Sequence, residues 1–464
     1  MTSPASPSSP QIRVLTLNCW GLKYLATHRR ARLHEIGRQL GAINPPPEIV
    51  GLQECWTQED YEAIRRETRE ILPHGKFYFG GVMGAGLAIL SRWPIVESAM
   101  YGYPLNGRPT AFFRGDWFVG KGVACARIRL PGGECGGEES DERGEGEVAA
   151  VFCTHLHAPY EREPNDSYLC HRTAQAWEIA KLMRSAAERG DVVIGLGDFN
   201  MLPSSFAHRL IVAHAPVQDA WSRLHPDSSL GAAIDPVEKE RGKLVPSAEY
   251  NLLENGVTCD SCVNTWRWTK EQMRRAQKDG EDVLTTDRKA ADPRGKRLDY
   301  IFVGGGWHAK WGVDSARVTM TQPHYTLGCS LSDHFAVEAV ISGSSESRAL
   351  TQGSGLTPET YDLILDMIDK YGQRERTQRR WRLGHFVASV LVSIGCFVGV
   401  WWTGDLPYVA FVLVVVSTLN FGAGILDGLI GGLFVSSELR ALKEFEWEVR
   451  NARRIADAGE KVGH

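Results

Sequence analysis

The sequence predicts an α+β domain followed by two membrane-spanning helices. Between residues 11 and 342, short β-rich apolar runs are separated by only a few helical stretches, which favours an α+β sandwich over a doubly wound sheet. Residues 343–358 are rich in Ser and Gly, as is typical of a linker. Two apolar runs follow it, and each is long enough to cross a hydrocarbon core as a helix.

The totals are those of a large globular chain with an accessory region. It has 464 residues and a formal net charge of -4, so no global basic excess points to nucleic acid as a partner. Residues 1–10 lack the basic and apolar segments of a secretory signal, and we expect a disordered tail there. A cytosolic domain should keep its cysteines reduced, so we interpret the lone pair Cys259 and Cys262 as plain thiols.

The predicted strands are short apolar runs that end in polar or turn residues. They are Ile12–Leu17, Ile49–Leu52, Gly86–Leu90, Val123–Leu130, Val148–Thr154, Val192–Leu196, Leu298–Val303 and Phe335–Ile341. Helices are expected near 27–41, 57–72 and 170–189. The acidic, Gly-rich stretch 131–147 is interpreted as a solvated hairpin insertion, and 270–297 as a second polar insertion.

The C-terminal region is predicted to anchor the chain. An amphipathic, basic segment at 359–382 precedes the hydrophobic region 383–435, whose spans are expected at about 383–402 and 406–432, with a helical tail at 436–464. The short gap between the spans forces the chain back to its starting side. Five arginines before the first span predict that this side is the cytosol: Arg374, Arg376, Arg379, Arg380 and Arg382. The 11–342 domain and both termini are then expected to be cytosolic as well. An endoplasmic reticulum or mitochondrial membrane would suit this topology.

Five polar motifs stand where predicted strands end. They are Leu17-Asn18-Cys19-Trp20, Leu52-Gln53-Glu54-Cys55-Trp56, Thr154-His155-Leu156-His157-Ala158, Gly197-Asp198-Phe199-Asn200, and Ser332-Asp333-His334-Phe335, the last preceded by Leu298-Asp299-Tyr300. Carboxylate and amide oxygens at such positions suit Mg²⁺, and histidines beside them can transfer protons near neutral pH. Each motif alone is weak, but all five in this order indicate one site.

In these motifs residues 11–342 resemble the endonuclease/exonuclease/phosphatase superfamily. The resemblance implies a deoxyribonuclease-I-like, four-layer α/β sandwich with its site at one rim. It implies that Glu54 is the main Mg²⁺ ligand, with Asn18 and Asp333 completing the metal and water network. It also implies that His334 is the general base, oriented by Asp299. The remaining implied roles are orientation of water and phosphate by Asp198 and Asn200, and a second phosphate contact from His155.

Further details resemble the neutral sphingomyelinase and inositol phosphosphingolipid phospholipase C family, especially its fungal members. The segment Gly115-Asp116-Trp117-Phe118-Val119-Gly120-Lys121-Gly122 resembles that family's P-loop-like element, in which Asp116 and Lys121 would be regulatory. A nucleotide-binding P-loop is excluded, because Gly122 replaces the required Ser or Thr and a strand follows instead of a helix. A basic hairpin without a regulatory role is the alternative interpretation.

The resemblance therefore implies Mg²⁺-dependent, phospholipase C-type hydrolysis of phosphosphingolipids to ceramide and a phospho-headgroup, with Mn²⁺ as a substitute. Two alternatives stay open: a lyso-phospholipid phospholipase C and a membrane-tethered nuclease. The expected partners are the bilayer, its phosphosphingolipid and an anionic phospholipid activator, without nucleic acid. A homodimer is a further expectation, because small residues in the second span leave a close-approach face; they are Gly422, Ala423, Gly424, Gly428, Gly431 and Gly432.

Overall fold

A computed structural model describes residues 11–131, 147–161, 165–272, 288–305, 311–343 and 355–462. The N-terminal tail and most of the acidic insertion, the second polar insertion and the linker lie outside these residues. The chain divides into two compact units. The sandwich unit comprises Met1–Tyr103, Val119–Asp166 and Arg172–Gly355. The hairpin unit comprises Pro104–Phe118, Ser167–His171 and Leu356–His464, so it includes two short segments from within the predicted 11–342 domain.

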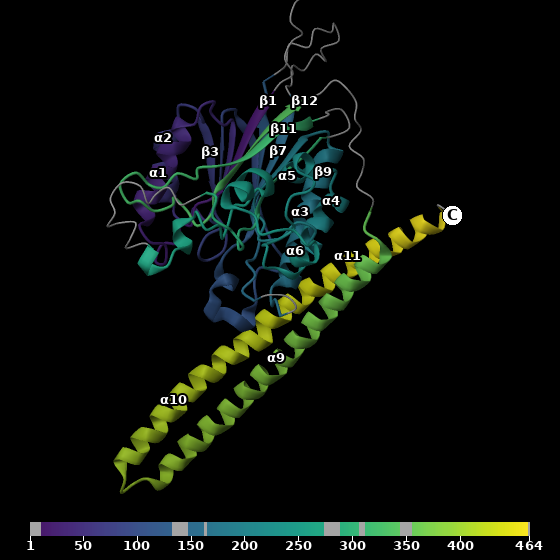
Figure 1. Ribbon diagram of the computed structural model, residues 1–464. Coiled ribbons are helices and arrows are strands. Elements are labelled where there is room, and N and C mark those ends of the chain that lie inside the picture. Colours follow the sequence, from purple (N-terminus) through teal and green to yellow (C-terminus); the bar gives the residue numbers. More distant parts are fainter. Residues whose placement is uncertain are drawn as a thin grey trace, which may run out of the picture. The chain divides into compact units, whose positions relative to one another are not determined.

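Two six-stranded sheets form the centre of the sandwich unit (Figure 1). The first has the order β11-β12-β1-β2-β4-β3 and the second the order β5-β6-β7-β8-β10-β9. Each sheet has one parallel pair, β1 with β2 and β7 with β8, and its other pairs are antiparallel. The strands are β1 (Gln11–Asn18), β2 (Ile49–Gln53), β3 (His74–Tyr78), β4 (Leu87–Ser91), β5 (Ile95–Gly102), β6 (Gly122–Arg129), β7 (Val148–His155), β8 (Val192–Asp198), β9 (Val217–Asp219), β10 (Asp299–Gly304), β11 (Trp311–Thr319) and β12 (Ala336–Gly343).

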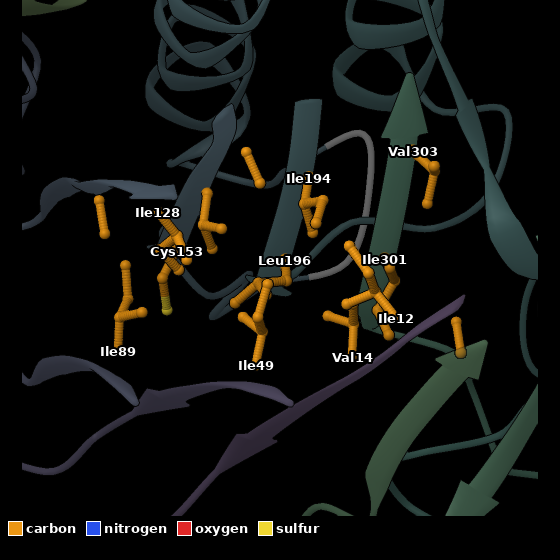
Figure 2. Close-up of a cluster of buried hydrophobic side chains, with 14 of the residues drawn as sticks. Ile12, Val14, Ile49, Ile89, Ile128, Cys153, Ile194, Leu196, Ile301 and Val303 are labelled. Atoms are coloured by element: carbon orange, nitrogen blue, oxygen red, sulfur yellow. The ribbon is translucent and has the colours of Figure 1, made fainter. Parts of the chain in front are cut away.

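Three apolar clusters hold four layers together. Between the sheets, Ile12, Val14 and Ile49 face Ile194 and Leu196 across a dry core (Figure 2). On the outer face of the first sheet lie α1 (Arg29–Ala42) and α2 (Gln58–Thr68). On the outer face of the second lie α3 (Leu169–Glu188) and α4 (Phe206–His214). Strands buried on both faces read as continuous apolar runs, so the predicted four-layer α/β sandwich is confirmed.

Short helical turns occupy the connections of the sandwich unit. They are α5 (Ala220–Leu224), α6 (Pro236–Glu240), α7 (Ala248–Tyr250), η3 (Asn251–Asn255) and η4 (Thr265–Arg267). All eight predicted strands and all three predicted helices are present within a few residues. Four strands that the sequence did not predict, β3, β5, β9 and β11, are the edge strands of the two sheets.

Two long antiparallel helices dominate the hairpin unit (Figure 1). The basic segment and the first predicted span form one helix, α9 (Pro358–Gly399), which η5 (Val400–Trp402) extends. The chain returns through α10 (Pro407–Leu429), the π-turn η6 (Ile430–Phe434) and α11 (Val435–Val462). Both helices are long and apolar enough to cross a membrane, and most of each apolar stretch is exposed. These are the two candidate membrane spans that the sequence predicted.

Glycines let α10 approach α9 closely. A Cβ atom on Gly424 would meet the Ser389 side chain at 2.4 Å, and Cβ atoms on Gly428 and Gly431 would meet α9 side chains at 3.0 and 3.1 Å. These three positions of the predicted dimer face therefore pack within the hairpin itself. The homodimer stays a prediction.

Buried charges join the base of the hairpin to the two short segments of its unit. Arg108 Nε lies 3.8 Å from Glu375 Oε1. Glu438 Oε1 accepts a 2.5 Å hydrogen bond from the Tyr371 hydroxyl and lies 2.9 Å from His171 Nε2. Burial raises the pKa of Glu375 to about 7 and that of Glu438 to about 8, so each carboxyl holds its proton more tightly than usual.

Candidate active site

The two parallel strand pairs bring the polar motifs to one rim of the sandwich. Asn18 ends β1 and Glu54 follows β2, while His155 and Asp198 end β7 and β8. Parallel strands place their carboxyl ends at the same edge of a sheet, so these side chains converge. The first residues of the antiparallel strands reach the same rim: Asp299 pairs with Asp198 in the ladder.

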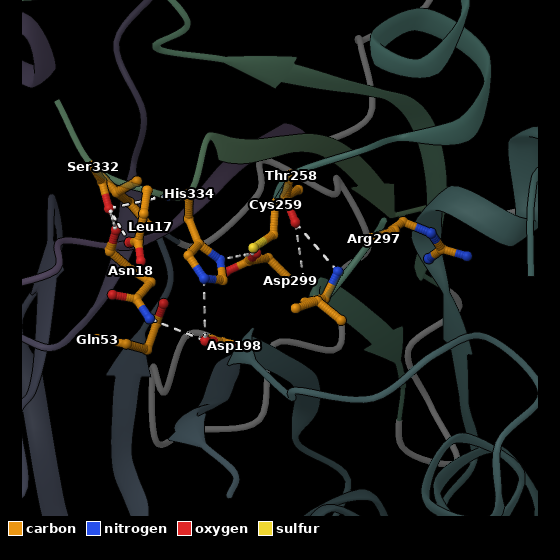
Figure 3. A network of polar contacts seen from close by, with 12 residues as sticks. Leu17, Asn18, Gln53, Asp198, Thr258, Cys259, Arg297, Asp299, Ser332 and His334 are labelled. Atoms are coloured by element: carbon orange, nitrogen blue, oxygen red, sulfur yellow. Dashed lines mark hydrogen bonds and ion pairs between the residues drawn. The ribbon is translucent and has the colours of Figure 1, made fainter. Parts of the chain in front are cut away.

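His334 stands between two carboxylates (Figure 3). Its Nδ1 atom lies 2.8 Å from Asp299 Oδ2, and its Nε2 atom lies 3.8 Å from Asp198 Oδ2. Burial by itself would lower the pKa of His334, but Cys259 and the two carboxylates raise it well above its usual value. Burial raises the pKa of Asp198 to about 7. Each ring nitrogen of His334 thus faces a carboxylate, which strengthens the histidine as a base.

Asp198 is the hub of the network. Its Oδ2 atom accepts hydrogen bonds from Asn18 Nδ2 at 3.0 Å and Asn200 Nδ2 at 3.3 Å, and it lies 3.5 Å from His155 Nε2. Its Oδ1 atom accepts from the Asn200 backbone N–H at 2.9 Å. Burial lowers the pKa of His155 well below its usual value, and the nearby Lys121 lowers it further. His155 is therefore a neutral donor or acceptor beside the hub.

Glu54 has the features of a cation ligand. Its Oε1 atom accepts from Asn18 Nδ2 at 3.2 Å, whereas its Oε2 atom is shielded from solvent and has no hydrogen-bond partner. Burial and the neighbouring Asp333 raise the pKa of Glu54. An unpartnered carboxylate oxygen beside a second carboxylate is the donor set that a hard divalent cation neutralises. As placed, Asn18 turns its amide N–H groups to Glu54 and Asp198, and its oxygen accepts from the Trp20 backbone N–H at 2.9 Å.

A second group could also hold a metal ion. Ligand atoms of Asp198, Asp299 and His334 lie within 4.8 Å of one another. Since His334 Nδ1 is already bonded to Asp299, this group has the geometry of a proton-transfer pair, whereas Glu54 Oε2 has no hydrogen-bond partner.

Strained backbone supports these positions. Trp20, Glu54 and Asn200 have φ values of 47°, 52° and 45°, and each stands one or two residues after a strand that ends at this rim. Side-chain-bearing residues adopt this left-handed conformation at a cost, and such strain gathers at functional sites. Gly21 is required in the first turn, because its N–H donates to Glu54 O at 3.0 Å and a Cβ atom would lie 2.3 Å from that oxygen.

Sequence reasoning missed Arg32 of α1. This side chain is fully buried and donates to the carbonyls of Thr27, Cys19, Trp20 and Leu331 at 2.8, 3.2, 2.8 and 2.6 Å. It therefore ties the turn after Asn18 to the segment that leads into the His334 motif. An arginine on a helix usually has a solvated head group, so nothing in the sequence marks this one.

The other predicted residues belong to the margin of this network or to the hairpin unit. Lys121 is buried in the sandwich unit and donates to the His155 and Leu156 carbonyls at 3.4 and 3.2 Å. Asp116 belongs to the hairpin unit, where its carboxylate lies close to Tyr168. Four of the five predicted juxtamembrane arginines are exposed. The fifth, Arg382, pairs with Asp427 and donates to Thr110 O at 3.0 Å.

Residues 15–334 match the endonuclease/exonuclease/phosphatase family. The chain belongs to this family.

Within the family, relatives are found that match almost the whole chain. It is 36% identical over 451 residues to the inositol phosphosphingolipids phospholipase C of Schizosaccharomyces pombe, covering 96% of this chain and 95% of that one. The Saccharomyces cerevisiae protein of the same name is 31% identical, with 95% and 90% covered. The chain thus belongs to the inositol phosphosphingolipid phospholipase C and neutral sphingomyelinase family.

Two other similarities cover part of the chain. Mouse sphingomyelin phosphodiesterase 2 is 35% identical over 46% of this chain and 47% of its own. Among solved structures, sphingomyelinase C of Streptomyces griseocarneus has a TM-score of 0.42 at 17% identity, covering 73% of this chain and all of its own.

Proposed function

We propose that this family member hydrolyses phosphosphingolipids in a divalent-cation-dependent, phospholipase C-type reaction that releases ceramide and a phospho-headgroup. The observation that carries the proposal is the Asp299–His334 pair facing Asp198, beside the unpartnered oxygen of Glu54. Inositol phosphosphingolipid is the first substrate to test, because the two yeast relatives at 36% and 31% identity carry that name. Sphingomyelin is the second, because a Caenorhabditis elegans relative that matches 95% of this chain is named a putative neutral sphingomyelinase.

His334 supplies the base. Asp299 holds Nδ1–H, which leaves Nε2 facing Asp198 as the atom that takes a proton from water. Asp198 accepts the second hydrogen bond of that water and aligns it toward phosphorus. The hydroxide forms a new P–O bond, the bond from phosphorus to the ceramide oxygen breaks, and that oxygen takes up a proton.

Neighbouring donors stabilise the charge that develops on phosphorus. Asn200 and His155 both lie beside Asp198 Oδ2, where they can donate to a phosphoryl oxygen. Glu54, with Asn18 and Asp333 around it, would hold the cation. A bound Mg²⁺ would neutralise the phosphoryl oxygens and the leaving alkoxide. The hard oxygen donors favour Mg²⁺, with Mn²⁺ able to replace it.

The hairpin suits an enzyme whose substrate lies in a bilayer. Two long apolar helices with exposed side chains would anchor the chain, and a tether raises the effective substrate concentration without new contacts. We propose that both termini and the sandwich face the cytosol, since exposed arginines precede the first span. Anionic phospholipid is the proposed activator, with Asp116 and Lys121 as the residues to test.

The first experiment uses the full chain in nanodiscs. Inositol phosphosphingolipid, sphingomyelin, a lyso-phospholipid and a DNA duplex are assayed with Mg²⁺, with Mn²⁺ and with EDTA. His334→Ala is compared with His225→Ala, which removes another histidine–carboxylate pair at 3.1 Å from Glu254.

The proposal expects ceramide release that needs the cation and is lost only in His334→Ala. The better of the two sphingolipids identifies the headgroup. Cleavage of DNA or of the lyso-phospholipid without ceramide release would refute the proposed substrate class. Ceramide release unchanged in His334→Ala would refute the proposed site.

A further inference from the structure

Two aromatic side chains project from a short segment of the hairpin unit. The segment η1 (Pro109–Arg114) carries Phe112 and Phe113, which are 43% and 75% exposed. The two rings contact each other edge to face, with centroids 6.1 Å apart. Neighbouring large aromatic residues this exposed are unusual on a surface that meets only water.

The hairpin holds this segment at the start of its apolar region. Arg382 precedes the first apolar run and donates to the Thr110 carbonyl at 3.0 Å, while its guanidinium also pairs with Asp427. At the end of the second apolar run, Phe434 stacks on Trp117 with ring centroids 4.4 Å apart. The segment is therefore fixed at the level where both helices pass from polar to apolar surface.

Buried polar contacts fix the approach to the segment as well. Arg108 lies 3.8 Å from Glu375, and its guanidinium also lies over the Tyr168 ring, 5.8 Å from the centroid. Thr110 and Glu375 side chains are 3.4 Å apart. These contacts all lie within the hairpin unit, so the outward direction of the aromatic pair is built into the unit and not a property of a loose loop.

Chain geometry limits how far the aromatic pair can lie from Thr110. Consecutive Cα atoms are about 3.8 Å apart, so Phe112 and Phe113 lie within roughly 8 and 11 Å of Thr110. Trp381, beside Arg382, is 75% exposed at the same height of α9. Tryptophan and phenylalanine at this height are the side chains that enter the boundary between headgroups and acyl chains.

We propose that η1 is an interfacial membrane contact, in which Phe112 and Phe113 insert into the bilayer beside the spanning hairpin. The occupant of this surface is the lipid bilayer, because Arg382 at the start of the first apolar run holds Thr110, and Phe434 at the end of the second run holds Trp117, three residues after the segment. The two rings add a third point of membrane contact to the two helices, and this point comes from the chain between β5 and β6. The inference depends on the hairpin lying in a membrane.

The test is photocrosslinking of the full chain in nanodiscs of phosphatidylcholine and phosphatidylserine that contain a radiolabelled phospholipid. Benzoylphenylalanine replaces Phe112 or Phe113, one at a time. The positive comparison is Leu391, 64% exposed within the first apolar run. The negative comparison is Leu363, 55% exposed on the same helix. It precedes Arg382 by nineteen residues, or about 28 Å of helix.

We expect lipid labelling at positions 112 and 113 to be within about threefold of Leu391 and roughly tenfold above Leu363, since interfacial side chains meet headgroups and upper acyl chains. If position 391 is labelled by lipid but positions 112 and 113 are labelled no more than position 363, the inference is overturned and the membrane hairpin is still supported. A crosslink from position 113 to a second copy of the chain would overturn it too. Absence of lipid at Leu391 would overturn both.

Discussion

Arg32 should control the geometry of the catalytic rim without touching substrate. Its guanidinium donates to four carbonyls, and two of these flank the turn after Asn18 while a third precedes the His334 motif. The Trp20 and Trp266 rings lie over it, 4.7 and 5.6 Å from its carbon. Among the described residues, the Arg32 side chain makes its hydrogen bonds to backbone carbonyls and not to a carboxylate. Its role is therefore to position these loops.

Arg32→Lys is the informative perturbation, because it keeps the charge. An ammonium has three donors and no planar fork, so at least one of the four carbonyls loses its partner. One unsatisfied buried carbonyl costs about 1–3 kcal/mol. A total stability of roughly 5–15 kcal/mol tolerates this loss, so the variant should fold. A displacement of about 1 Å at the rim costs on the order of 10²-fold in rate.

The assay measures kcat, KM and the thermal midpoint of the variant. We expect a kcat loss of about 10–100-fold with little change in KM, since the site and not lipid binding is displaced. Arg29→Lys is the matched control: Arg29 is also buried in α1 but pairs with Asp60, which a lysine can still do. The control should lose stability without losing kcat. Equal kcat values in both variants would refute the positioning role.

Three other outcomes follow from the structure. Asp299→Asn should lower kcat by about 10²–10⁴-fold, because His334 loses the carboxylate acceptor that fixes its tautomer. A small effect on kcat together with a large effect on KM would contradict this. Glu54→Gln should raise the Mg²⁺ concentration for half-maximal activity, measured by titration, with an unchanged requirement as the contrary result. The pKa values of Glu375 and Glu438, raised to about 7 and 8 by burial, mean that folding takes up protons. Local stability at the hairpin base should therefore be greatest near pH 4.5 and fall as the pH rises to about 8. Hydrogen exchange, corrected for the intrinsic exchange rate, measures this stability, and Glu438→Gln should flatten its pH profile. A flat profile for the wild-type protein would contradict the prediction.

The central strands could be predicted from the sequence and the edge strands could not. Runs such as Val192–Leu196 are buried on both faces, so every residue carries the apolar signal. In β11 and β5 most residues are partly or fully exposed, and apolar residues are interrupted by polar ones and Gly, so neither strand gives a continuous apolar run. An edge strand is specified mainly by its neighbour in the sheet, and that neighbour cannot be read from a local window.

The site followed from the sequence to the extent that strand ends determine it. Asn18 and Asp198 end β1 and β8 at one rim, and His334 stands just before β12, which runs antiparallel to β1 and so begins at that rim. Their residue types limit the chemistry. Arg32 was missed because its partners are backbone carbonyls, which leave no trace in sequence. The assignment of residues 104–118 to the hairpin unit was missed because it depends on contacts such as Arg108 with Glu375, far apart along the chain.

The pairing of Arg382 also changes how the basic segment is interpreted. The sequence placed this residue with four other arginines facing the membrane surface. In the structure its guanidinium is bound to Asp427 and to the Thr110 carbonyl. Exposed Arg374, Arg376, Arg379 and Arg380 are left as the candidates for contact with anionic headgroups.

Hydrolysis in water enriched in oxygen-18 tests the proposed chemistry most directly. The nanodisc-bound chain is given inositol phosphosphingolipid and, separately, sphingomyelin with Mg²⁺, and both products are weighed by mass spectrometry. Attack of the water held by Asp198 and His334 on phosphorus predicts one heavy oxygen atom in each phospho-headgroup and none in ceramide, with neither product formed in EDTA. Heavy oxygen in ceramide, or products that form equally well in EDTA, would contradict the account.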